Sequence, residues 1–108
     1  MSAHKENITW EEAVIEAGIA RGKYWSFQDI YPEVEALKGE RWGKIANPEE
    51  TVRASVYALR GRGLIAGDKD TYTVTDEGRR WLEARRLLKD LSPEEKKRLR
   101  ELIDGRKT

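Results

Sequence analysis

The chain has 108 residues, of which 38% are hydrophobic and 38% charged, and its formal net charge at pH 7 is +1. This length suits a single domain with one modest core, and the near-neutral charge excludes nucleic-acid binding through an overall positive field. The chain has no cysteine and no apolar run long enough to span a membrane, which excludes a disulfide framework and predicts a cytoplasmic location.

The N-terminal residues predict a flexible tail followed by a helix. Residues 1–8 are mostly polar, and His4, the only histidine, is expected to be solvated there. Thr9 and Glu12 have the spacing of a capping box, so a helix should begin here and end at Gly22. Its apolar residues recur at spacings of three and four, as on a helix with one buried side: Trp10, Ala13, Val14 and Ala17.

A short aromatic segment and a second helix follow. Lys23-Tyr24-Trp25 is expected to pack in the core or against a sheet, and the alternative is an exposed platform that stacks on bases. Ser26 and Asp29 can cap the helix, and Pro32 lies where it can split the helix at Tyr31. The apolar stripe of this helix is Phe27, Ile30, Val34 and Leu37.

Residues 38–46 are predicted to connect this helix to the next one. Trp42 and Ile45 are expected to pack the connection onto the core. The alternative is that its basic side chains reach the phosphates of a bound nucleic acid: Lys38, Arg41 and Lys44. The two interpretations are compatible, because they use different side chains of the same segment.

The segment from Asn47 to Gly61 is predicted to be a third helix. Asn47 can cap it, Pro48 suits its first turn, and the two glutamates that follow place negative charge at the positive end of the helix dipole. Gly61 and Gly63 can adopt the left-handed conformation that ends a helix. One side of the helix is expected to face the core: Val52, Ser55, Val56 and Leu59.

A β-hairpin is predicted directly after this helix. Leu64-Ile65-Ala66 is a short apolar strand, and Gly67-Asp68-Lys69-Asp70 has the composition of a turn. The segment from Thr71 to Thr75 alternates β-branched and aromatic residues, as a second strand does.

Two runs carry a family resemblance: TVRASVYALRGRGLI and YTVTDEGRRWL. They resemble the recognition helix and wing of winged helix-turn-helix DNA-binding domains, such as MarR-type and PadR-type regulators and the winged-helix modules of restriction enzymes. The resemblance covers Trp10 to Leu88 and is strongest from Thr51 to Leu82. It implies an α+β, mostly α fold, namely a winged helix-turn-helix with a two-stranded wing and one or two extra C-terminal helices. The implied organisation is a tail (1–8), a winged-helix domain (9–76), C-terminal helices (77–105) and a tail (106–108).

The C-terminal part is predicted to add two helices. Asp76 is expected to cap the first of them, and Ser92 with Pro93 to begin the second. Their apolar residues exceed what one small core needs, so we predict a homodimer interface; the alternative is that these helices fold back over the first helix. The predicted dimer residues are Trp81, Ala84, Leu88, Leu91, Leu99 and Leu102.

Residue types needed for catalysis are scarce in this chain. It has no cysteine nucleophile, no histidine with converging partners and no glycine-rich phosphate loop. The acidic pairs at 11–12, 49–50 and 94–95 each lie in the first turn of a predicted helix, where helix-dipole complementarity explains them. We therefore predict that the protein is not an enzyme and uses no cofactor and no metal.

The outward side of the third helix carries the prediction of DNA binding. From Thr51 to Arg62 the chain has three arginines and no acidic residue, and arginine can hold guanine or phosphate with two parallel hydrogen bonds. In the resembling families the positions of Arg53, Ala54 and Tyr57 enter the major groove. The plain alternative is an ordinary solvated helix face. We expect groove contacts from Thr51, Arg53, Ala54 and Tyr57, and phosphate contacts from Lys44, Arg60, Arg62 and Lys69.

The predicted wing departs from the family pattern, because Asp68 and Asp70 flank Lys69 where DNA-contacting wings carry basic residues. We expect little affinity from it. The function predicted is sequence-specific binding of double-stranded DNA by a cytoplasmic, nucleoid-associated transcriptional regulator that forms a homodimer. The alternatives are a winged-helix adaptor that docks a protein without binding DNA, and the DNA-binding component of a viral, mobile-element or restriction system.

Overall fold

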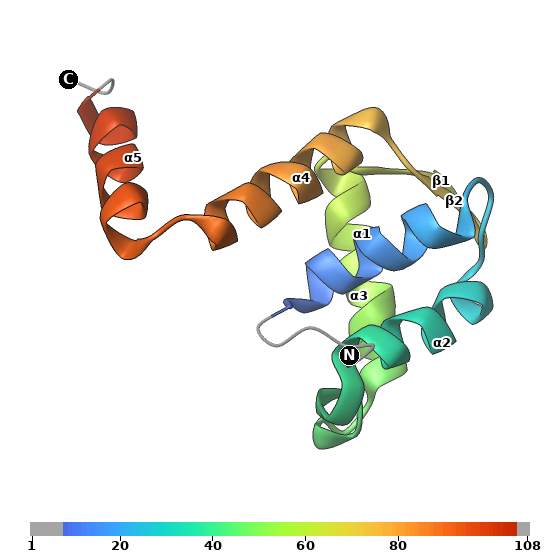
Figure 1. The fold of residues 1–108 in the computed structure, drawn as a ribbon. Coiled ribbons are helices and arrows are strands. Elements are labelled where there is room, and N and C mark those ends of the chain that lie inside the picture. Colours follow the sequence, from blue (N-terminus) through green and yellow to red (C-terminus); the bar gives the residue numbers. More distant parts are fainter. Residues whose placement is uncertain (1–7, 106–108) are drawn as a thin grey trace.

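The computed structural model describes residues 8–105, so the predicted tails 1–7 and 106–108, with His4, lie outside the described residues (Figure 1). Between these limits the chain is mostly helical, with five α-helices and one two-stranded antiparallel sheet, which confirms the predicted α+β class. The elements in order are α1 (Trp10–Arg21), α2 (Phe27–Lys38), the 3-10 helix η1 (Gly39–Lys44), α3 (Pro48–Gly61), β1 (Ile65–Asp68), β2 (Thr71–Val74), α4 (Asp76–Asp90) and α5 (Pro93–Gly105).

The first three α-helices begin where their capping residues predicted. The Thr9 hydroxyl accepts a hydrogen bond from the Glu12 amide at 3.1 Å, and the Glu12 carboxylate accepts one from the Thr9 amide at 2.9 Å. Ser26 and Asp29 form the same reciprocal pair at the start of α2. The Asn47 side chain accepts from the Glu50 amide at 3.1 Å. These bonds satisfy amides that have no partner inside the helix.

Pro32 does not split the second helix, which is continuous from Phe27 to Lys38. The connection after it is also more regular than predicted, because the six residues Gly39–Lys44 form a 3-10 helix. Trp42 is half-buried, and its ring lies 5.9 Å from that of Trp10. The expectation that Trp42 holds this segment on the core is therefore confirmed.

A glycine ends α3 and turns the chain into the hairpin. Gly63 has φ of +80°, its amide donates to the Arg60 carbonyl at 3.0 Å, and the Leu64 amide donates to the Leu59 carbonyl at 3.0 Å. This pair of bonds is a Schellman motif, in which the left-handed residue satisfies the last carbonyls of the helix. Gly63 takes this role, whereas Gly61 is the last residue of α3.

The hairpin turn is tighter than predicted. Gly67 and Asp68 belong to β1, where they pair with Tyr72 and Thr71, and the turn is left with only two residues. Lys69 and Asp70 both have positive φ, 50° and 63°, which is the backbone of a type I′ turn.

A third short segment joins the sheet at its other edge. The Trp25 amide donates to the Tyr72 carbonyl and the Tyr72 amide donates to the Trp25 carbonyl, both at 2.8 Å. Trp25 is buried at 1% exposure, so it has the core role that was predicted for this segment, while Tyr24 beside it is 71% exposed with φ of +62°.

Helix α1 is the centre of the core and packs against α2, α3, α4 and β2 (Figure 1). Its fully buried side chains include Ala13, Val14, Ile15 and Ala17. Ile8, which was predicted to lie in the flexible tail, is also buried and belongs to the core. Ile8 therefore belongs to the folded body and not to the predicted tail.

The start of α4 corrects the prediction by one residue. Thr75, not Asp76, is the N-cap: its hydroxyl accepts from the Gly78 amide at 3.0 Å and donates to the Gly63 carbonyl at 2.8 Å. Gly78 is buried against the hairpin, and a Cβ there would collide with the Leu64 carbonyl. Asp76 lies in the first turn, where its charge complements the helix dipole.

Beyond Leu82 no described side chain is buried, and we call residues 83–105 the C-terminal arm. Leu82 is the last buried residue of α4, whose first half packs on α1. The rest of α4 runs away from the body and α5 stands at its far end (Figure 1). The alternative that both helices fold back over the first helix is therefore wrong for α5. In the described residues, no helix combines the length and apolar character needed to cross a membrane.

Candidate nucleic-acid interface

The two sides of α3 differ in burial as its sequence predicted. Val52, Val56 and Leu59 are fully buried, and Ser55 is half-buried at the edge of that side. The outer side is open to solvent, and neither the hairpin nor the described part of the arm covers it (Figure 1). Its exposed residues are Ala54, Tyr57, Ala58 and Arg60.

Arg53 lies at the edge of this open side and is held in place by α2. Its Nη1 donates to the Tyr31 hydroxyl at 3.0 Å. Tyr31 is itself buried, and its ring stacks on Phe27 with centroids 6.4 Å apart. The hydrogen bond to Tyr31 raises the pKa of Arg53. Because a guanidinium has five N–H donors, most of them are left for another partner.

Tyr57 joins the open side of α3 to a cluster of aromatic rings. It is 52% exposed, and its ring meets Phe27 edge-on at a centroid distance of 5.8 Å. Phe27 in turn contacts Tyr72 of β2 at 5.2 Å, and Tyr72 contacts Trp25 at 5.7 Å. Burial, followed by the neighbouring Tyr57, raises the pKa of Tyr72. The inner rings fix Tyr57 while half of its surface stays accessible.

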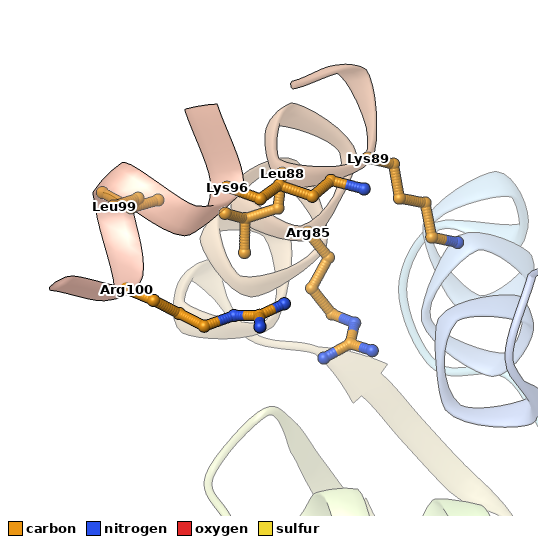
Figure 2. A pocket seen from close by; sticks show the side chains of 6 residues that line it. All are labelled: Arg85, Leu88, Lys89, Lys96, Leu99 and Arg100. Carbon is orange, nitrogen blue, oxygen red and sulfur yellow. The ribbon is translucent and has the colours of Figure 1, made fainter. Parts of the chain in front are cut away.

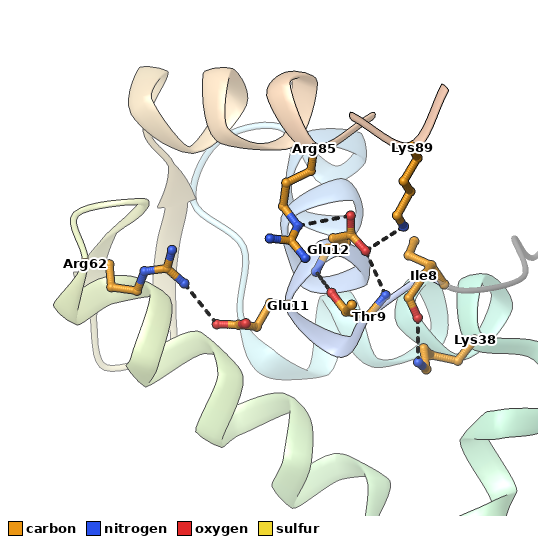
Figure 3. A network of polar contacts seen from close by, with 8 residues as sticks. All are labelled: Ile8, Thr9, Glu11, Glu12, Lys38, Arg62, Arg85 and Lys89. Atoms are coloured by element: carbon orange, nitrogen blue, oxygen red, sulfur yellow. Dashed lines mark hydrogen bonds and ion pairs between the residues drawn. The ribbon is translucent and has the colours of Figure 1, made fainter. Parts of the chain in front are cut away.

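The predicted phosphate contacts are not on one surface. Lys44, Arg60 and Lys69 are exposed, at the end of η1, on α3 and at the tip of the hairpin. Arg62 is directed instead at α1 and α4. Its Nη1 lies 3.3 Å from the Glu11 carboxylate (Figure 3). Its guanidinium lies 5.6 Å from the Trp81 ring.

Lys38 cannot reach a phosphate, so that part of the alternative for residues 38–46 is wrong. It is 4% exposed, and its Nζ donates to the Ile8 carbonyl at 2.9 Å (Figure 3). The same Nζ lies 4.6 Å from the Trp10 ring centroid. Burial lowers the pKa of Lys38. Lys38 is buried because the end of α2 packs against the start of α1.

Acidic side chains border the candidate interface. Glu49 and Glu50 are exposed in the first turn of α3, and the Asn47 amide group donates to Glu50 at 3.1 Å. Asp68 and Asp70 are exposed on either side of Lys69. The basic part of the interface is therefore confined to the middle and end of α3 and to Lys44.

The six predicted dimer residues do not form one seam. Trp81 is half-buried against the core, with the Arg85 guanidinium 5.0 Å from its ring centroid. Leu91 is half-buried and Ala84 is exposed. Leu88 and Leu99 instead face a groove between α4 and α5 (Figure 2). Leu102 is 64% exposed.

The sequence interpretation missed a buried carboxylate that joins α4 to α1. Glu12 is 1% exposed, and its oxygens lie 3.2 Å from Arg85 Nε and 2.7 Å from Lys89 Nζ (Figure 3). Burial alone would raise the pKa of Glu12, but the hydrogen bonds from Lys89 and Thr9 and the charge of Lys89 lower it to about 2. The available signal was the spacing of four between Arg85 and Lys89, which places both on one side of a helix.

In comparisons with known proteins, no family model, no curated protein and no solved structure matched the chain. The function is therefore inferred from its geometry. Among the described residues, no three histidine, cysteine or acidic side chains gather as a metal site. What the described surface does provide is a helix with an open, partly basic side whose arginine and tyrosine are held by buried neighbours.

Proposed function

We propose that the protein is a winged helix-turn-helix DNA-binding protein that recognises a specific duplex sequence and regulates transcription. The order of elements supports this fold, because three helices are followed by an antiparallel hairpin, with Trp25 bridging to its outer strand. The single observation that carries the function is the open side of α3, on which Arg53 is oriented by the buried Tyr31. An oriented arginine loses less freedom on binding than a mobile one.

The proposed mechanism is insertion of α3 into the major groove. Arg53 donates two parallel hydrogen bonds to guanine O6 and N7, and Ala54 lets the helix approach closely and contacts a thymine methyl group. Thr51 and Tyr57 contact base edges or the adjacent backbone. Arg60 and Lys44 hold phosphates, which fix the register without reading sequence. Lys69, between two aspartates at the hairpin tip, contributes least.

Selection of bound duplexes from a random library tests the proposal. We expect the chain to enrich one motif, and Arg53→Ala to weaken binding of that motif about ten- to a hundredfold while relaxing the preference at one base pair. Arg98→Ala is the matched control, since it removes an exposed arginine of α5 and should keep the motif. No enrichment at low salt, or equal effects of the two variants, would contradict the proposal.

A second candidate function is a protein-docking module that uses the same side of α3. It is favoured by the exposed Ala54, Tyr57 and Ala58, beside which Glu49 and Glu50 bring negative charge. This candidate predicts that Tyr57→Ala abolishes capture of a protein partner while no duplex is bound by either form. The library selection therefore separates the two functions in one measurement.

Association of two copies through α4 and α5 stays a prediction. The exposed leucines that suggest it lie among cations, since Leu88 and Leu99 line the groove with four basic residues. A symmetric contact at this place would bring like charges together. The DNA-binding proposal therefore requires only one copy at each site.

A further inference from the structure

A groove lies between α4 and α5, away from the side of α3 that the proposed DNA binding uses (Figure 2). It encloses about 310 Å³ and is lined by one leucine and two cations from each helix. Leu88 and Leu99 are 40% and 36% exposed, so their apolar surface is accessible to a partner. The lining residues are Arg85, Leu88, Lys89, Lys96, Leu99 and Arg100.

The charge of the groove selects its occupant. No acidic side chain lines it, and residues 85–100 hold seven basic and three acidic residues in a chain whose net charge is only +1. Arg85 and Lys89 already bond to Glu12, so Lys96 and Arg100 are the cations most available to an occupant. An occupant that is both apolar and anionic satisfies this lining, whereas a basic one would be repelled.

The apolar surface extends beyond the groove. Leu87 and Leu102, at 62% and 64% exposure, add to the surface of Leu88 and Leu99 on the same two helices. A small ligand that fills the groove would leave these two leucines in water. A helix with an apolar stripe can cover leucines spaced along two helices.

The length of α5 also favours a helical partner at this groove. It has 13 residues and stands at the end of the arm, away from the core (Figure 1). Helices of about this length are marginal in water without a packing partner, because the apolar face supplies most of their stability. A helix laid across α4 and α5 would supply that packing.

We propose that the groove between α4 and α5 binds an acidic amphipathic helix of a partner protein. The apolar stripe of that helix covers Leu88 and Leu99, and its carboxylates pair with Lys96 and Arg100. This interface is separate from the open side of α3, so the chain can hold a duplex and a protein partner at the same time.

A designed peptide tests this proposal with the full chain. The probe is a fluorescein-labelled helix of about 18 residues, long enough to span α5, with leucines at spacings of three and four and glutamates beside them. Its control carries lysine in place of every glutamate. Fluorescence anisotropy should show saturable binding of the acidic peptide at micromolar concentration and about tenfold weaker binding of the lysine peptide.

Two charge-reversal variants locate the binding site. Lys96→Glu with Arg100→Glu should weaken binding of the acidic peptide at least about tenfold, because both cations line the groove. Lys97→Glu with Arg98→Glu changes the net charge of α5 equally, but these residues do not line the groove, so affinity should stay within about twofold of the unmodified chain. Circular dichroism of both variants shows that their helices are retained.

Three results would overturn the proposal. The first is no saturable binding of the acidic peptide, or equal weakening by the two double variants. The second is a dimeric mass in light scattering that Leu99→Asp converts to a monomer, which would assign the groove to a second copy of the chain. The third is displacement of the peptide by duplex DNA in the Arg53→Ala variant, which would assign the cations of the groove to phosphates.

Discussion

Up to Leu82 every α-helix and both strands contribute buried side chains to one core, whereas no side chain described between 83 and 102 is buried. The arm also carries apolar residues, since this segment holds five leucines. The difference is that leucines of the body stabilise the chain itself, while those of the arm keep their surface in water. Cations differ likewise: Arg85, Arg86 and Lys89, close to the body, pair with carboxylates of α1, whereas Lys96 and Arg100 of α5 line the groove.

This comparison is tested most strongly by matched leucine truncations. Leu59→Ala, in the core side of α3, should lower the free energy of unfolding by about 3 kcal/mol, because it removes buried surface and leaves a cavity. Leu102→Ala, in the arm, should change it by less than about 0.5 kcal/mol. Urea denaturation followed by circular dichroism measures both. Equal losses would show that the arm is part of the core.

The junction between body and arm should be sensitive to acid. The pKa of Glu12 is about 2 in the folded chain and 4.5 as its ordinary value, so its contribution is complete above about pH 4.5 and is lost as the pH falls toward 2. Glu12→Gln should cost about 2 kcal/mol at neutral pH, less than a fully buried pair because Arg85 and Lys89 are partly exposed. The free energy of unfolding of the unmodified chain and of Glu12→Gln is measured between pH 2 and 7. The same pH dependence in both forms would contradict this prediction.

The body and the arm should also differ in their effect on duplex affinity. Arg60→Ala, on the open side of α3, should weaken binding about fivefold and reduce the salt slope by about 1, because one phosphate contact is lost. Arg98→Ala removes an equal charge from the arm and should have an effect below about twofold. Titrations at several salt concentrations measure both quantities, and a larger effect of Arg98 would place the duplex on the arm.

The smallest expected effect on duplex affinity comes from removing the group of the body that orients Arg53. Tyr31→Phe keeps the ring that stacks on Phe27 and removes only the hydroxyl that holds Arg53. Duplex affinity should fall about threefold with the unfolding free energy little changed, since one hydrogen bond at a half-exposed guanidinium is lost. If Tyr31→Phe lowered the duplex affinity of the unmodified chain and of the Arg53→Ala variant by the same factor, Tyr31 would act independently of Arg53.

Local sequence patterns predicted what depends on neighbours in the chain. The capping residues of α1, α2 and α3, the buried side of α3 and the hairpin follow from spacings of two to four residues, and they are found in the structure. The start of α4 was misplaced because Thr75 and Asp76 are both good caps, and the choice depends on the bond from Thr75 to Gly63. The turn was predicted too long because Gly67 was assigned to it rather than to β1.

Features that depend on distant residues were not predictable from one sequence. Lys38 was considered as a phosphate contact, but its partner is the Ile8 carbonyl, 30 residues earlier. Glu12 was interpreted as a capping-box residue and through the helix dipole, and its further partners are on α4, more than 70 residues later. The spacing of Trp81 predicted a dimer contact but could not show that its ring packs against the core between Arg62 and Arg85.

The hydroxyl of Thr75 sets the direction in which the arm leaves the molecule. It donates to the Gly63 carbonyl just after α3 and accepts from the Gly78 amide in the first turn of α4. The two helices therefore meet at a fixed joint, with the hairpin between them in the chain. Because the hairpin and the first half of α4 also pack on α1, this joint holds α4 at a fixed angle to α3. The side of a bound duplex on which α5 would stand therefore follows from the packing of the body together with this one hydroxyl.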